Sequence, residues 1–199
     1  MASTDLRDRM ISTFIAQVTS VGGHVAQVRD LAGARDYIVR LAIDSNATRI
    51  VLCARGLARE LFPLDAASEQ LEIASQTDMP REKFFNAVKM ADIGVTLVDL
   101  AVAETGTVIL ATSDEAERLA TALPRIHVAL VSQSKLVFSL QDAEPHVSRF
   151  LEGAGRGGAV SLISGPSRTA DIEGRLVVGV HGPRELHVCL LGQELRGGR

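Results

Sequence analysis

Hydrophobic positions recur along the chain at two spacings, one typical of helices and one of strands. Apolar side chains fall on one helical stripe over residues 5–20, and the glycine pair 22–23 is expected to end that N-terminal helix, which lies within residues 1–20. Short apolar runs predict strands at 24–28 and 48–54, with a second helix over 31–47 between them. Strands and helices that alternate in this order are typical of an α/β sheet.

The second half of the chain has a sharper pattern. Strands are expected at 92–97, 107–111, 126–131, 159–163, 176–180 and 186–191, and a helix at 141–152. The second and third of these strands lack polar alternation, as do parallel strands that are buried on both faces. We therefore predict that residues 107–131 form a strand–helix–strand crossover, in which Thr112 and Glu115 form a capping box before a helix at 113–122.

The region between these halves is less regular. Pro63 and Pro80 divide residues 55–90 into a helical turn, a short strand near 71–74 and a helix near 81–90. No repeat and no long linker separates the elements. The whole pattern predicts one α/β domain over residues 1–199, with a mostly parallel, Rossmann-like sheet and flanking helices.

Composition excludes several classes of protein. The chain is 46% hydrophobic and 23% charged, so it is not a disordered protein. Its net charge is −3, its arginines are scattered and it has no Trp, which argues against binding to nucleic acid. No apolar run reaches the length of about 20 residues that spans a bilayer, and no signal peptide precedes the first helix, so we expect a cytoplasmic protein.

The cysteines and histidines predict no metal site in this chain. Cys53 and Cys189 lie far apart among apolar residues, and no C-x-x-C motif exists to hold zinc or an iron–sulfur cluster. The histidines and carboxylates do not fall at ligand spacing along the sequence. We expect two buried thiols instead.

A polar segment at 164–173 is the first candidate site. Gly165 and Pro166 predict a tight turn after a strand, followed by a short helix that Ser167 or Thr169 would cap. A helix start at the end of a strand binds anions, and an arginine adds a bidentate contact. The candidate ligand-binding residues are Ser164, Gly165, Ser167, Arg168, Thr169 and Asp171. A capped helix whose polar groups satisfy only one another explains the same pattern equally well.

Two further motifs carry candidate chemistry. In residues 103–107, the Glu104 carboxylate is followed by Thr105 and Gly106, and a substrate can approach closely beside a glycine, so Glu104 is a candidate base or nucleophile. His181 lies in the Gly-Val-His-Gly-Pro turn over residues 179–183, and as a histidine it is a further ligand candidate. For both motifs a solvated loop residue is the simpler alternative. The G-x-G-x-x-G run at 153–158 lacks the strand before it and the helix after it, so we interpret it as a connector.

The order of these motifs is similar to that of the lactate utilization protein C family, with its LUD domain. The matching segments are 91–96, 103–108, 123–128, 163–173 and 179–183, and the resemblance is densest over 90–191. It implies a fold like that of the ribose-5-phosphate isomerase and CoA-transferase group. It also implies a role in oxidising L-lactate to pyruvate, beside partner subunits that carry iron–sulfur clusters.

Two functions from different classes follow. The first is a subunit of a lactate-oxidising complex, which binds a small anion or a nucleotide at the 164–173 loop. The alternative is a free-standing enzyme that resembles acyl- or CoA-transferases or the cyclo-ligases. In related CoA-transferases the nucleophile is a Glu followed by x-Gly, which Glu104-Thr105-Gly106 resembles. Both hypotheses expect Glu104 and Arg168 to face each other across one crevice, and an assembly protein with a vestigial pocket is a third option.

Overall fold

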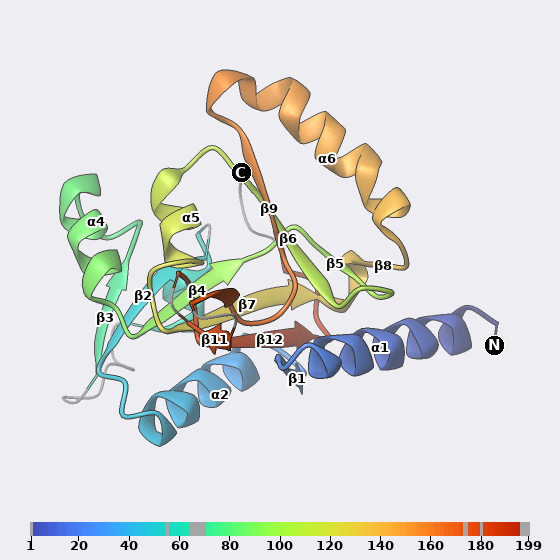
Figure 1. Ribbon diagram of the computed structural model, residues 1–199, viewed down its shortest axis with the longest axis horizontal. Helices are drawn as coiled ribbons and strands as arrows, with labels where there is room; N and C mark the ends of the chain where they lie inside the picture. Colours follow the sequence, from blue (N-terminus) through green and yellow to red (C-terminus); the bar gives the residue numbers. More distant parts are fainter. Residues whose placement is uncertain (1, 55, 64–70, 173–174, 180, 196–199) are drawn as a thin grey trace.

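The computed structural model describes residues 2–54, 56–63, 71–172, 175–179 and 181–195 (Figure 1). The α-helices are α1 (Ala2–Ser20), α2 (Leu31–Asp44), α3 (Ala58–Leu61), α4 (Arg81–Met90), α5 (Glu115–Ala120) and α6 (Leu140–Ala154), with 3-10 turns η1 (Gln133–Lys135) and η2 (Gly155–Gly157). The strands are β1 (His24–Val28), β2 (Arg49–Cys53), β3 (Glu72–Ser75), β4 (Ile93–Leu97), β5 (Leu100–Val102), β6 (Thr107–Thr112), β7 (Ile126–Ser132), β8 (Leu136–Val137), β9 (Ala159–Ile163), β10 (Arg168–Ile172), β11 (Arg175–Val178) and β12 (Glu185–Leu191).

A six-stranded parallel sheet forms the centre of the molecule, in the order β1-β12-β7-β4-β2-β3. Helix α2 packs on one face, where Ile38 joins the core formed by Ile50 and Ile126. Helices α4 and α5 cover part of the other face, where Phe84 packs on Val51. Helices lie on both faces of the sheet (Figure 1). The predicted α/β class, with a mostly parallel sheet and flanking helices, is therefore confirmed.

A second sheet of four strands, in the order β8-β5-β6-β9, was not predicted. Strand β6 belongs to this sheet and pairs antiparallel with β5 and β9, whereas β7 belongs to the parallel sheet. The predicted crossover over 107–131 is therefore wrong. The middle of strand β6 is apolar because Val108 and Leu110 face the core beneath α1 while Ile109 faces α6. The apolar run indicates that the strand is buried on both faces. It does not indicate whether the strand pairs with its neighbours in parallel or antiparallel.

The start of α5 also differs from the prediction. Asp114 caps this helix, and its Oδ1 accepts a hydrogen bond from Ala116 N at 2.8 Å. The Thr112 hydroxyl accepts a hydrogen bond from Asp114 N at 3.0 Å, so the expected box between Thr112 and Glu115 is not formed. A capping box occurs instead at α6, between Ser139 and Asp142.

The helix expected after residue 166 is replaced by the antiparallel hairpin β10–β11. Ser167 explains why, because both of its backbone groups pair with a distant segment. Its N–H donates to Pro183 O at 2.9 Å, and its carbonyl accepts from Gly179 N at 2.9 Å. These bonds compete with the local bonds of a helix, so the premise of an anion-binding helix start at this loop is wrong.

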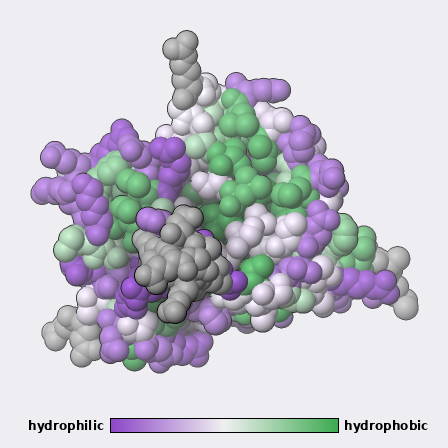
Figure 2. Space-filling model, viewed as in Figure 1, coloured by the Kyte–Doolittle hydropathy of each residue, from purple (hydrophilic) through white to green (hydrophobic). Residues whose placement is uncertain are grey.

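The surface carries apolar side chains over α6 and the strands beneath it (Figure 2). Large exposed hydrophobic residues in these elements are Leu140, Leu151 and Leu162. None of the helices in the described part of the chain combines the length and the apolarity needed to cross a bilayer.

Candidate functional site

The structure brings together two of the predicted segments through a chain of hydroxyl groups. The Thr107 Oγ1 lies 2.7 Å from Thr105 Oγ1 and 2.7 Å from Ser164 Oγ. Thr107 is buried at the start of β6, opposite the residue that follows β9, so the antiparallel pairing of these strands sets the contact. Thr105 and Ser164 therefore lie close together on either side of Thr107, so this part of the 103–107 motif lies beside the start of the 164–173 segment.

The two glycines of these segments face helix α1. Gly106 has φ +64°, and a Cβ added there would lie 2.5 Å from Val18 N. Gly165 has φ +88°, and its Cβ would lie 2.9 Å from Val21 O. Both positions need glycine for a left-handed backbone and for close packing on the end of α1. Their conformation is explained without a ligand.

Glu104 and Arg168 contact different helices. Glu104 is exposed, and its Oε1 accepts a hydrogen bond from Leu140 N at 3.1 Å, at the N-terminus of α6. Arg168 Nη2 donates a hydrogen bond to Val21 O at 2.6 Å, just after α1. Each of these hydrogen bonds goes to the backbone at the end of a helix, and the arrangement of Glu104 and Arg168 across one crevice stays a prediction. The side chains of Thr169 and Asp171 and the whole of residue 173 lie outside the described residues.

A groove of about 480 Å³ lies beside Ser167 and contains the predicted ligand residue His181. We call it the arginine groove. It is lined by Ala122, Leu123, Arg125, Gly179, His181, Gly182 and Arg184. His181 and Arg184 are exposed, and they come from the turn that enters β12, while Arg125 enters β7. Since β7 and β12 are parallel neighbours, both arginines reach the same edge of the sheet.

Sequence reasoning missed Arg125 and Arg184. The signal was present, since each residue lies just before one of two apolar strands that pair in parallel, but the pairing itself was unknown. Arg125 Nη2 donates to Ser45 O at 2.7 Å, and its Nε lies 3.5 Å from Asp92 Oδ1, so its position is fixed.

Two glycines allow the turn at residues 179–184 to pack tightly. Gly179 has φ +76°, and the aliphatic stem of Arg184 occupies the place that a Cβ would take. A Cβ on Gly182 would lie 2.9 Å from Ser167 Cβ. Ser167, which was predicted as a ligand residue, therefore supports the turn that carries His181 and Arg184.

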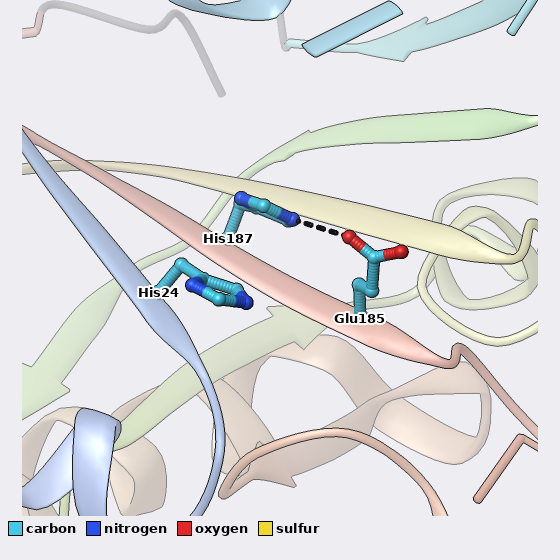
Figure 3. Close-up of side chains that lie close together, drawn as sticks. All are labelled: His24, Glu185 and His187. Atoms are coloured by element: carbon cyan, nitrogen blue, oxygen red, sulfur yellow. Dashed lines mark hydrogen bonds and ion pairs between the residues drawn. The ribbon is translucent and has the colours of Figure 1, made fainter. Parts of the chain in front are cut away.

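A second cluster of chemistry-bearing side chains, drawn in Figure 3, lies on the face of the sheet that α2 covers, since Tyr37 of α2 contacts it. It contains His24, Glu185 and His187, whose potential ligand atoms all lie within 4.8 Å of one another. His187 is buried, and its Nε2 lies 3.0 Å from Glu185 Oε2, while its Nδ1 lies 2.7 Å from the Tyr37 hydroxyl. Sequence reasoning expected no metal ligands because these residues are separated along the chain.

Burial changes the acid–base properties of several side chains in the sheet. It raises the pKa of Tyr37 to about 12 and lowers the pKa of His127 to about 3. The Nε2 of His127 lies 2.9 Å from Thr96 Oγ1, whereas its Nδ1 has no hydrogen-bond partner among the described residues. Both cysteines are buried as expected, and burial raises the pKa of the Cys189 thiol to about 12.

The crystal structure of a DUF162 family protein from Deinococcus radiodurans has the same fold. It superposes with a TM-score of 0.65, covering 94% of this chain and 98% of that protein at 20% sequence identity. At this level of identity the likeness concerns the fold alone.

Sequence comparison finds relatives with a higher sequence identity to this chain. The chain is 30% identical over 186 residues to lactate utilization protein C of Shouchella clausii, covering 93% of this chain and 79% of that protein. It is 38% identical over 193 residues to lactate utilization protein C of Halalkalibacterium halodurans, covering 95% of this chain and 81% of that protein. The sequence model of the LUD domain matches residues 11–191, and the chain therefore belongs to the LUD domain family.

Proposed function

We propose that this chain acts in lactate utilization as a cytoplasmic subunit of a complex that oxidises L-lactate to pyruvate. The relatives named lactate utilization protein C support the lactate system. The oxidation removes two electrons, which in this proposal pass to iron–sulfur clusters on partner subunits. The placement of the clusters on partner subunits is supported by Cys53 and Cys189, because both are buried in separate strands of the sheet rather than gathered at one site.

The observation that carries the ligand part of the proposal is the arginine groove. Lactate and pyruvate are small carboxylates, and a guanidinium offers a planar pair of donors to a carboxylate. Arg184 and His181 stand on a glycine-rich turn at one side, and Arg125 stands at the other. A small anion in the groove would contact these side chains, while Ser167 holds the turn in place through its two backbone hydrogen bonds.

The apolar surface over α6 and β9 supports the presence of partners. Leu151 and Leu162 are both about half exposed, at 46% and 55%. Exposed apolar residues that gather on one face are typical of surfaces that other proteins cover.

Calorimetry on the isolated chain tests the ligand. Lactate, pyruvate and inorganic phosphate are titrated separately into the wild type, Arg184→Ala and Arg40→Ala. Arg40 is an exposed arginine of α2 outside the groove and serves as the matched control. We expect Arg184→Ala to weaken binding of at least one anion by about ten-fold or more, the loss of one charged hydrogen bond, and Arg40→Ala to leave it unchanged. Equal affinities in all three proteins would refute the groove as the site.

Assembly is tested in cells. Deletion of this chain should stop growth on L-lactate, and a purified tagged chain should carry cysteine-rich, iron-containing partners with it. The Arg184→Ala variant should still recover these partners, because none of the residues that line the groove belongs to α6 or β9. Normal growth of the deletion strain on lactate contradicts the proposed role.

A further inference from the structure

We propose that His24, Glu185 and His187 form a binding site for a divalent first-row transition-metal ion, with Zn²⁺ as the best-suited probe. The proposal is independent of the arginine groove and of any role in lactate oxidation. Three protein ligands leave at least one coordination position, which faces solvent on the side of exposed His24.

The sheet itself sets the ligands side by side. His24 of β1 is the register partner of His187 in the parallel strand β12. Glu185 lies two residues before His187 on the same strand, so alternation along the strand places all three side chains on one face. Figure 3 shows the three side chains on this face of β1 and β12. The positions of the ligands therefore follow from strand pairing rather than from a flexible loop.

The ligand atoms lie near one another, but further apart than they would around a bound ion. The two imidazole rings stack with centroids 4.6 Å apart, and all candidate ligand atoms lie within 4.8 Å of one another. Zinc bound at about 2.0–2.1 Å in a tetrahedral site holds its ligand atoms roughly 3.3 Å apart. The two rings are stacked with 20° between their planes, and an imidazole binds a metal in its ring plane, so binding requires the exposed His24 ring and the Glu185 side chain to turn toward the ion.

Tyr37 acts as the orienting partner of His187. Its hydroxyl lies 2.7 Å from Nδ1, which directs Nε2 toward Glu185 and the site. Neutral His187 carries one ring proton, and binding of a metal at Nε2 requires that proton on Nδ1. The Tyr37 oxygen can accept it, because a phenol both donates and accepts hydrogen bonds. Such a second partner for a ligating histidine is a regular feature of metal sites in proteins.

The ligand set selects among ions. Two imidazoles and one carboxylate suit zinc, cobalt and nickel, whereas magnesium and calcium prefer oxygen ligands alone. Cys189 lies further along the same face of β12, but it is fully buried and is not one of the three side chains whose ligand atoms lie together, so it is outside the ligand set.

The experiment uses the full chain without a polyhistidine tag, stripped of metal by a chelator. Zinc is titrated in competition with a chromophoric chelator, and we expect one equivalent per chain. His24→Ala and Glu185→Gln should each weaken zinc binding by at least about ten-fold, whereas His146→Gln, a histidine of α6, should bind as the wild type does. Tyr37→Phe keeps the ring and should weaken binding about ten-fold through loss of the orienting partner.

Circular dichroism confirms that each variant is folded, and His24 is the primary test because it is exposed. Magnesium should not compete with zinc. Failure of the wild type to take zinc from the chelator, equal zinc affinity in His24→Ala, or magnesium binding as tight as zinc binding overturns the site. None of these outcomes depends on whether the chain binds lactate.

Discussion

Arg168 Nη2 donates a hydrogen bond to the carbonyl oxygen of Val21 at 2.6 Å, and this contact joins the start of β10 to the residue after α1. Gly22 lies directly beneath the guanidinium, with φ +83°, and a Cβ there would come within 2.5 Å of Nη2. The contact connects parts of the chain that are 147 residues apart in sequence. Arg168 therefore anchors the start of β10 on the end of α1.

Replacement of Arg168 by alanine should destabilise the fold modestly. The hydrogen bond to Val21 is charge-assisted but exposed, so we expect the free energy of unfolding to fall by about 1 kcal/mol. Urea unfolding followed by circular dichroism measures the change. Arg40→Ala is the control and should stay within about 0.5 kcal/mol of the wild type. An unchanged free energy of unfolding in Arg168→Ala would remove the anchoring role.

Gly106→Ala should lower the free energy of unfolding more than Arg168→Ala does. The substitution places a Cβ 2.5 Å from Val18 N and 2.7 Å from Gln17 C, at a φ of +64°. Strain and overpacking together should lower the free energy of unfolding by about 2 kcal/mol or more. Gly153→Ala is the matched control within α6, where nothing lies within 4 Å of the added Cβ. Because alanine favours helix, that variant should be slightly more stable, by about 0.5–1 kcal/mol.

Asp92 should make stability depend on pH. Partial burial favours its neutral form, but hydrogen bonds from Thr48 N at 2.9 Å and Arg49 N at 3.0 Å, together with Arg125, outweigh burial and hold the pKa of Asp92 below its ordinary value. A lowered pKa stabilises the fold above the unfolded-state pKa of about 4, and this stabilisation is lost as the pH falls below that value.

The difference in unfolding free energy between the wild type and Asp92→Asn tests this. It should be about 2 kcal/mol in favour of the wild type at pH 7 and should shrink below about pH 4. All other acids titrate in both proteins, so their effects cancel in the difference. A difference that stays constant down to pH 3 would mean that the Asp92 charge does not stabilise the fold.

Glu104→Gln separates a structural role from a chemical one. Glutamine keeps an oxygen that can accept the hydrogen bond from Leu140 N, and only the favourable charge at the N-terminus of α6 is lost. We expect a loss of stability below about 1 kcal/mol and intact binding to partners. Any acyl- or CoA-transferase activity of the chain should disappear in this variant, as measured with labelled CoA. Full activity in Glu104→Gln would rule out the nucleophile.

The sequence by itself determined where most elements lie. Helices α1, α2 and α4 and strands β1, β2, β7 and β12 all occur where hydrophobic periodicity predicts them. Periodicity succeeds because it records which side of an element is buried, and burial is a local property of each segment. The motif order over 90–191 also identified the LUD family, which the match over residues 11–191 confirms.

Tertiary structure alone decided which strands pair and which side chains meet. The apolar run of β6 is compatible with either sheet, and only its antiparallel bonds to β5 and β9 assign it to the second one. The same is true of Ser167, whose distant backbone partners replace a helix by a hairpin. Hydrogen bonds between strands join residues far apart in the chain, so no local pattern can show that His24 lies beside His187, or that Arg125 and Arg184 share one edge of the sheet.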